Sequence, residues 1–343
     1  MFQHILVPLD GSQRAEQAIP IAAQVARASG GSLFFLRVVD TLQELGVYSS
    51  LAAIYLQEML EKERIEAAAY LEEITASPAL VGIKSQSAVF SGSAASMLLH
   101  VAQQEDIDLI VLCSHGYTGF KRWALGSVAQ KVARYSPIPI LLVREQNLKL
   151  KERIAHGIRA LVALDGSPFA EAILYPAAHL VAALSTPGQG ELHLVQLVET
   201  ATIEEEFGFM LDDDFNYRQT ALRAAGNYLQ ALRTRLVQDS ALPEGVHITW
   251  AVEECKDVAD ALIQIAESGK GILSQKPSDL IALTTHGRGG LQRWIVSSVT
   301  ERVLHASTLP LFIVHSRGSA ASLIEEKEEA SPLAPGEQGR DVL

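Results

Sequence analysis

The feature that most constrains this chain is an internal repeat, which has to be found before any single element is interpreted. The matched segments are HILVPLDGS (4–12) with RALVALDGS (159–167), SHGYTGFKRW (114–123) with THGRGGLQRW (285–294), and SPIPILLV (136–143) with STLPLFIV (307–314). Asp10 corresponds to Asp165 at an offset of 155, and the later matches share an offset of 171. Three matches in the same order indicate two copies of one domain.

The growth of the offset predicts insertions in the second copy, and two turn-rich segments, Ser185–Gly190 and Ser268–Ser278, are the candidates. The predicted boundaries are a first domain at 1–146, a linker at 147–157, a second domain at 158–316 and a disordered tail at 317–343. The linker is polar and charged, as inter-domain segments usually are. The tail is acidic, rich in Ala, Ser, Gly and Pro, and shows no apolar period.

Each copy reads as strands that alternate with helices. Short apolar runs predict strands at Ile5–Leu9, Leu33–Val39, Ile83–Phe90, Leu109–Cys113 and Ile140–Val143, and at Leu161–Leu164, Leu192–Val198, His247–Val252, Leu280–Leu283 and Leu311–Val314. The first predicted helix begins near Ser12, with Ser12 as its N-cap. Further helices are predicted at about Leu51–Ala76, Ala94–Gln104 and Ser127–Arg134, with counterparts at Asn216–Val237, Val258–Glu267 and Ser298–His305. The alternation predicts an α/β fold, with a doubly wound five-stranded parallel sheet in each copy.

In such sheets ligands bind beyond the carboxyl ends of the strands, where the strand order reverses. The first and fourth strands of each copy end in the LDGS and SHG or THG loops. If these strands are neighbours, the two loops line one crevice.

Composition narrows the classes of partner. The net charge is -12, whereas nucleic-acid and anionic membrane surfaces attract basic patches, so we expect neither partner. Cys113 and Cys255 lie far apart, which argues against a disulfide scaffold or a thiolate zinc site. We see no signal peptide and no run of about 18 apolar residues, and we expect a cytoplasmic protein.

The first copy carries a loop suited to an anion. Gly116 is followed by nine residues and then by Gly126 and Ser127, where a helix is predicted to begin. Glycine lets the backbone approach a phosphate, and the free N–H groups and positive dipole end of a helix hold it. Asp10 ends the first strand, where a carboxylate can accept hydrogen bonds from ribose hydroxyls.

Taken together, these motifs make the chain resemble a tandem member of the universal stress protein family, over residues 2–143 and 158–315. The resemblance implies a Rossmann-like fold of the adenine nucleotide alpha hydrolase type. Nucleotide-binding members carry the motif G-x2-G-x9-G-[ST]; here Cys113 stands at the first glycine, whereas Gly116, Gly126 and Ser127 match.

By this resemblance, Asp10 would hold the ribose, the backbone of Val38 would meet the adenine edge, and the backbone at Gly116, Gly126, Ser127 and Val128 would hold the phosphates. The residues assigned to the first site are Pro8, Leu9, Asp10, Val38, Cys113, His115, Gly116, Gly126, Ser127 and Val128. The ligand would be ATP or another adenine nucleotide, with or without Mg²⁺. No catalytic residue and no metal-binding residue of the protein is assigned.

The second copy departs further from the motif. Thr284 and Ser297 stand where the first and third glycines belong, and a Cβ there would crowd a phosphate and disfavour positive φ. We therefore expect a weaker or empty second site. Its assigned residues are Asp165, Leu197, Gly287 and Ser298.

Several conspicuous residues have plain structural interpretations beside the functional ones. Asp10 and Asp165 can stabilise the turns that follow their strands, and Gly126 with Ser127 can be an ordinary helix start. His115 and His286 are favoured as loop-fixing residues rather than bases, since no nucleophile or carboxylate is spaced to complete a triad. The repeated Trp123 and Trp294 are favoured as packing residues. The side chains of Lys121 and Arg122 either lie over the phosphates or face solvent.

The sequence therefore predicts a stress-response protein that binds an adenine nucleotide as a sensor or regulatory partner. The alternatives are a weak ATPase or phosphotransferase, and a nucleotide-free interaction module. The resemblance also implies that the two copies pair within the chain through Ile140–Val143 and Leu311–Val314, which would protect exposed strand edges. A homodimer of such chains is left open.

Overall fold

The structure, a computed structural model, describes residues 1–40, 50–114, 125–144, 157–199, 212–271, 276–285 and 297–315. We call residues 1–144 the first half and residues 157–315 the second half. The predicted linker, except for Gly157, and the predicted tail lie outside the described residues.

The first half contains five strands and their connecting helices. The strands are β1 (His4–Pro8), β2 (Ser32–Val39), β3 (Lys84–Ser91), β4 (Leu109–Cys113) and β5 (Ile140–Val143). The helices are η1 (Ala15–Gln17), α1 (Ala18–Ser29), α2 (Ser50–Thr75), η2 (Pro78–Leu80), α3 (Ala94–Gln104) and α4 (Ser127–Tyr135). Each predicted strand and helix is present, with ends shifted by one or two residues at most for the strands.

The second half repeats this order. Its strands are β6 (Arg159–Leu164), β7 (Gly190–Glu199), β8 (Val246–Cys255), β9 (Leu280–Thr284) and β10 (Leu311–Val314). Its helices are α6 (Pro168–Glu171), α7 (Leu174–Ser185), α9 (Asp212–Gln238), α10 (Val258–Ser268) and α11 (Ser298–Ala306). β7 and β8 are longer than their predicted spans, and they pair with each other from Gly190 and Val246 to Glu199 and Cys255.

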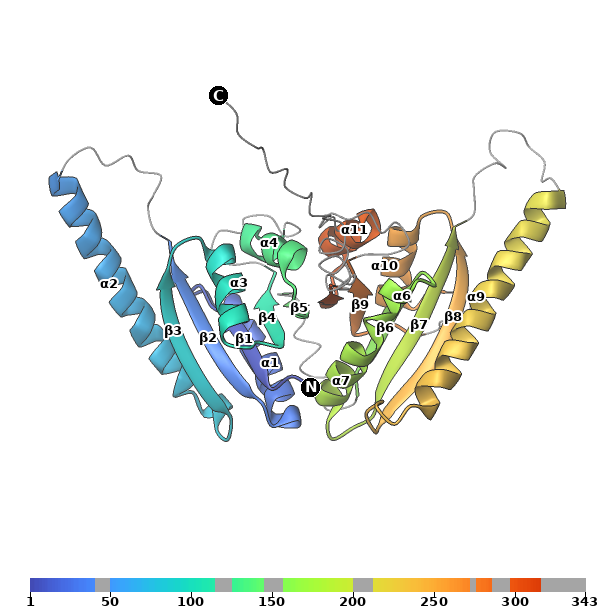
Figure 1. The fold of residues 1–343 in the computed structure, drawn as a ribbon, viewed down its shortest axis with the longest axis horizontal. Coiled ribbons are helices and arrows are strands. Elements are labelled where there is room, and N and C mark those ends of the chain that lie inside the picture. Colours follow the sequence, from blue (N-terminus) through green and yellow to red (C-terminus); the bar gives the residue numbers. More distant parts are fainter. Residues whose placement is uncertain are drawn as a thin grey trace, which may run out of the picture.

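All ten strands form one sheet with the order β3-β2-β1-β4-β5-β10-β9-β6-β7-β8. Strands are parallel within each half, as predicted, and the halves meet where β10 pairs antiparallel with β5. In that pair Phe312 lies opposite Leu141. The predicted intrachain pairing through the last strands is therefore present. Figure 1 shows the two halves side by side, with β5 and β9 near the middle of the view.

Helices cover both faces of the sheet, and each face has its own apolar cluster. The α1, α2, α7 and α9 side packs one cluster, and the α3, α4, α10 and α11 side packs the other. Each cluster includes residues of both halves, so the two cores are continuous across the β5–β10 seam. Buried strands such as β4, in which every residue is buried, account for the continuous apolar runs in the sequence.

Further contacts also hold the halves together. Phe2 packs edge-on against Phe312, with ring centroids 6.3 Å apart. Arg134 of α4 forms an ion pair with Glu301 of α11 at 2.8 Å. The residues that follow the last strands also cross the seam: Arg144 donates to the carbonyl of Leu304 at 2.5 Å, and His315 Nε2 lies 3.3 Å from the carbonyl of Arg134.

Among the described residues, one helical stretch is long and apolar enough to be weighed as a membrane span. This stretch is Pro168–Ser185, with a mean hydropathy of 1.2, and 56% of it is buried inside the protein. It comprises α6 and α7, and α7 packs against α1 and β7. That burial accounts for its apolar composition.

Candidate functional site

The turn after the first strand has the same geometry in both halves. In the first half the Ser12 N–H donates to Asp10 Oδ1 at 2.9 Å, and in the second the Ser167 N–H donates to Asp165 Oδ1 at 2.9 Å. Gly11, which lies between Asp10 and Ser12, has a φ of +85°, a conformation that only glycine adopts readily. The proposed turn-stabilising role of both aspartates is therefore present, and it leaves each carboxylate at the carboxyl end of its strand.

The start of the helix is made by the serine of each turn. Ser12 Oγ accepts the Ala15 N–H at 3.2 Å, and Ser167 Oγ accepts the Ala170 N–H at 3.2 Å. Ser12 thus caps the turn that leads through η1 into α1, as predicted. Its hydroxyl also donates to Asp10 Oδ1 at 2.6 Å, which adds a second bond to that carboxylate.

The turn lies beside the end of the fourth strand, because β4 is the neighbour of β1 and β9 is the neighbour of β6. Ser114, which follows β4, is fully buried, and its carbonyl accepts the Gly126 N–H at 2.8 Å. In the second half the carbonyl of Thr285 accepts the Ser297 N–H at 2.9 Å. These bonds fix the starts of α4 and α11 at the strand ends, where the crevice is expected.

The two helix starts differ in how their first N–H groups are used. Gly126 precedes α4, and among the described residues no side chain caps that helix. Ser297 precedes α11, and its hydroxyl accepts the Thr300 N–H at 3.1 Å. One of the donors that an anion would use at α11 is therefore already taken by the protein's own side chain.

The backbone at these two positions is alike, which corrects one expectation. Gly126 has φ -62° and ψ 147°, and Ser297 has φ -59° and ψ 150°. A positive φ is not required at either residue, so the predicted backbone penalty at Ser297 is wrong. The difference in capping between the two helix starts arises from the side chain, because only serine has a hydroxyl that can bond to its own helix.

A second hydroxyl strengthens this difference. Thr300 Oγ1 donates to the carbonyl of Thr284 at 3.0 Å and lies 2.8 Å from Ser297 Oγ. The corresponding residue of the first half is Ala129, which has no hydroxyl. The start of α11 is thus tied internally by two hydroxyls, whereas the start of α4 is made of Gly126, exposed Ser127 and half-buried Val128.

Most predicted residues of the first site lie together at the carboxyl ends of β1, β2 and β4. Pro8 ends β1, Val38 lies near the end of β2 and Cys113 ends β4, where it is buried. Leu9 is also buried, and its N–H donates to the carbonyl of Leu36 at 2.8 Å. In the second half Asp165, Leu197 and Ser298 hold the equivalent places after β6, in β7 and at the first residue of α11.

Other assigned residues fall outside the described part of the chain. These are His115, Gly116 and Gly287, together with Lys121, Arg122, Trp123, His286 and Trp294. The described residues therefore test the strand ends and the helix starts of the crevice but not the loops between them.

Sequence reasoning missed a set of side chains next to the turn. The Tyr70 hydroxyl of α2 donates to Glu16 Oε1 at 3.0 Å, and the Tyr228 hydroxyl of α9 donates to Glu171 Oε1 at 3.0 Å. The Arg37 guanidinium lies 5.3 Å from the centre of the Tyr70 ring. Glu16 and Glu171 share the offset of 155, so an extension of the repeat alignment past the LDGS motif could have revealed them.

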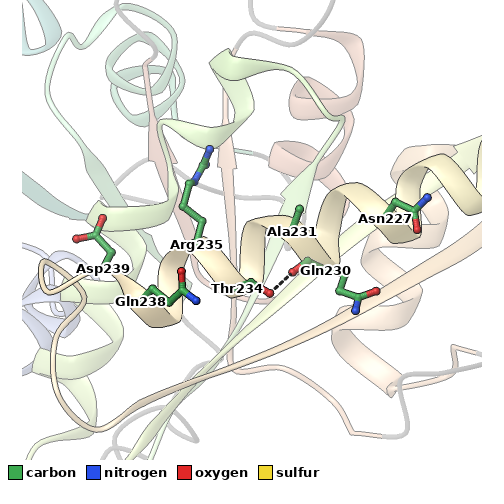
Figure 2. Close-up of a pocket in the computed structure, with 7 residues that line it drawn as sticks. All are labelled: Asn227, Gln230, Ala231, Thr234, Arg235, Gln238 and Asp239. Carbon is green, nitrogen blue, oxygen red and sulfur yellow. Dashed lines mark hydrogen bonds between the residues drawn. The ribbon is translucent and has the colours of Figure 1, made fainter.

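The second half also has a shallow surface groove of about 770 Å³ on α9. Figure 2 shows that its lining comes from α9 and the residue after it: Asn227, Gln230, Ala231, Thr234, Arg235, Gln238 and Asp239. Arg235 pairs with Glu171, and Asp239 accepts from the Tyr175 hydroxyl. Its charged groups are engaged within the protein, and no residue of the crevice lines it.

Comparisons with known proteins agree with this geometry. The model of the universal stress protein family matches residues 1–144 and again residues 159–315. Universal stress protein YxiE of Bacillus subtilis is 30% identical over 148 residues, which is 42% of this chain and 100% of that protein. A universal stress protein of Thermus aquaticus is 34% identical over 146 residues, again 42% of this chain and 100% of the relative.

A solved structure is similar over nearly the whole chain. The crystal structure of a universal stress protein from Archaeoglobus fulgidus covers 92% of this chain and 99% of its own, with a TM-score of 0.56 and 20% identity. That likeness supports the arrangement of two domains in one fold. With two matches to the family model that together cover most of the chain, this protein belongs to the universal stress protein family and carries two copies of its domain.

Proposed function

We propose that the first half binds an adenine nucleotide and that the protein acts in the cytoplasm as a nucleotide-responsive sensor or regulatory partner in a stress response. Asp10 would hold the ribose, the backbone of Val38 would meet the adenine edge, and the start of α4 would hold the phosphates. The observation that carries the proposal is the start of α4, which has a glycine at its cap and, among the described residues, no side-chain cap.

The residues present fit a phosphate at this place. Gly126 has no Cβ to block close approach, and the first N–H groups of α4 lie at the positive end of the helix dipole. Ser127 is exposed and adds a hydroxyl. Asp10 is exposed at the neighbouring strand end. Together these groups supply donors for the phosphates and an acceptor for the ribose within one crevice.

Any Mg²⁺ would enter with the phosphates in this proposal. Within the described ranges, no group of three His, Cys, Asp or Glu side chains could hold a metal ion. Efficient phosphoryl-transfer catalysts hold Mg²⁺ with carboxylates and supply cationic clamps. We therefore place binding ahead of turnover, with slow ATP hydrolysis as the competing function.

The test is calorimetric titration of ATP into the wild-type chain and into Gly126→Val. A valine side chain at the cap would crowd the phosphates, so we expect the affinity to fall roughly 100-fold, comparable to the loss of two charge-assisted hydrogen bonds. Ser297→Val is the matched control in the second half, and it should leave the tight site unchanged. An unaltered affinity in Gly126→Val would contradict the assignment.

Steady-state ADP release separates a sensor from an ATPase. We expect release no faster in the wild type than in Gly126→Val at saturating ATP. ADP release by the wild type well above that of the variant would show that the protein is an ATPase rather than a sensor. A wild-type chain that retains no nucleotide after purification and binds none in titration would favour an interaction module.

A further inference from the structure

We propose that Tyr70 and Tyr228 are positioning residues that tie the long outer helix of each half to its Asp-Gly-Ser turn. In the first half, this link would transmit the state of the turn to the exposed part of α2. The positioning role stands by itself, and only its response to ligand rests on the proposed nucleotide site.

The same hydrogen bond occurs in both halves, although the sequences between its partners differ. Tyr70 donates to Glu16 across 54 positions, and Tyr228 donates to Glu171 across 57 positions, each at 3.0 Å. Glu16 lies in η1 and Glu171 ends α6, so each acceptor belongs to the first helical turn after the Asp-Gly-Ser segment. A bond kept at the same place in both copies, between an outer helix and this turn, points to a shared task.

In the first half, a cation joins the link directly to the turn. Arg37 stacks on the Tyr70 ring, and its Nη1 lies 3.2 Å from the position that a Cβ on Gly11 would occupy. The guanidinium therefore lies between the turn and the tyrosine. A cation over an aromatic face is attracted to it, so the ring and the guanidinium hold each other in place.

In the second half, the cation comes from the outer helix itself. Gln196 replaces Arg37 at the matching position of β7, and Arg235 of α9 pairs with Glu171. The glutamate is thus held by Tyr228 and Arg235 together. The tyrosine–glutamate bond is constant between the halves, whereas the source of the cation changes.

The electrostatic surroundings agree with a link that reaches the aspartate. Burial raises the pKa of Tyr70, and the Glu16 hydrogen bond and the charges of Glu16 and Asp10 raise it further. Burial likewise raises the pKa of Tyr228, followed by the charge and hydrogen bond of Glu171 and the charge of Asp165. Both hydroxyls therefore remain protonated donors near the carboxylate of their own turn.

The link leads to a surface. Tyr70 lies in the last third of α2, and the preceding side chains from 57 to 66 are exposed except for half-buried Leu60. Figure 1 shows α2 and α9 as the outermost helices, at opposite edges of the molecule. A shift of the turn that moved Tyr70 would therefore reach a helix segment that faces solvent.

The positioning role is tested without ligand by hydrogen exchange in the full chain. Tyr70→Phe keeps the ring for Arg37 but removes the donor, so exchange in the segment 10–17 should rise about fivefold, the change expected from one net hydrogen bond. Glu16→Gln keeps an acceptor oxygen and should exchange like the wild type. Equal exchange in Tyr70→Phe and the wild type would overturn the proposal.

The transmission role is tested by adding ATP with Mg²⁺ to the same proteins. We expect ATP to slow exchange in the segment 57–66 of the wild type and of Tyr228→Phe, and to leave it unchanged in Tyr70→Phe. ATP that binds without any change in that segment would overturn transmission. If the wild type binds no ATP, the proposed nucleotide site fails, while exchange at 10–17 still decides the positioning role.

Discussion

The two halves share one fold but differ in the polar side chains at the start of α4 or α11 and in the middle strands. At the start of α4 the first half has Gly126, with no side-chain cap in the described part of the chain, whereas at the start of α11 the second half has Ser297 bonded to its own helix. In the core, the second half has His193 on β7 where the first has Phe34 on β2. The comparison shows that the two copies share the backbone conformation at Gly126 and Ser297 and yet use the first N–H groups of the helix differently.

The histidine belongs to a hydrogen-bonded network of the second half, in which His193 is buried, Glu191 is half-buried and Thr249 is exposed. Thr249 Oγ1 donates to Glu191 Oε1 at 2.6 Å and lies 2.8 Å from His193 Nδ1. Since the threonine proton points to the carboxylate, His193 Nδ1 must carry the proton that joins it to Thr249. Nε2 is buried and then has no hydrogen-bond partner among the described residues.

The largest expected effect is therefore on acid stability. Burial, reinforced by Arg159, lowers the pKa of His193 to about 4 from its ordinary 6.5, against the opposite effect of Glu191. The unfolded chain binds this proton more readily, so the stabilisation is complete above pH 6.5 and is lost as the pH falls through about 4. The difference corresponds to roughly 3 kcal/mol.

Urea unfolding at a series of pH values measures this effect, with His193→Phe as the variant that copies Phe34. We expect the free energy of unfolding of the wild type to fall more steeply between pH 6.5 and 4 than that of the variant. If the unfolding free energies of the wild type and His193→Phe change with pH in parallel, protonation of His193 does not distinguish the halves.

The next effect concerns the helix start of the first half. Gly126→Ser gives α4 the cap that α11 has, and the new hydroxyl should bond to the Ala129 N–H. We expect ATP affinity to fall about tenfold, or roughly 1.4 kcal/mol, because one donor is withdrawn from the phosphates. Calorimetric titration measures this loss, with Ser297→Ala in the second half as a control that keeps glycine at the cap of α4. An affinity equal to the wild type would show that capping does not separate the halves.

The reverse exchange should have a smaller effect. Ser297→Gly frees the Thr300 N–H, and we expect second-site affinity to rise a fewfold while the unfolding free energy drops by a few tenths of a kcal/mol. Adding Thr300→Ala, the residue of the first half, should increase the gain. A double variant that still binds one nucleotide would place the defect elsewhere in the second half.

The smallest effect is expected at the contact between α4 and α11. Arg134 and Glu301 form an ion pair whose side chains are 38% and 41% exposed. Pairs of this exposure contribute less than about 1 kcal/mol, so Arg134→Ala should barely change the unfolding transition. A large loss of stability would mean that the seam depends on this pair rather than on β5, β10 and their apolar neighbours.

Much of the fold was predictable because its signals are local. Apolar runs such as Leu109–Cys113 locate the buried strands, and the repeated LDGS turn locates both aspartates. From the sequence, Ser297 could be recognised only as a residue that replaces the motif's glycine. Its hydrogen bond to the Thr300 N–H could not be predicted, because that bond depends on the folded helix start. The contact of Tyr70 with Glu16 leaves no helix or strand periodicity, and only an extended repeat alignment could have pointed to the glutamate.

The central claim is that one half binds nucleotide tightly and the other does not. Titration of ATP into the intact chain, with native mass spectrometry to count bound nucleotides, tests this claim most directly. We predict one tightly bound nucleotide per chain, which Gly126→Ser weakens and Ser297→Ala leaves in place. Two sites of equal affinity in the wild-type chain would contradict the account.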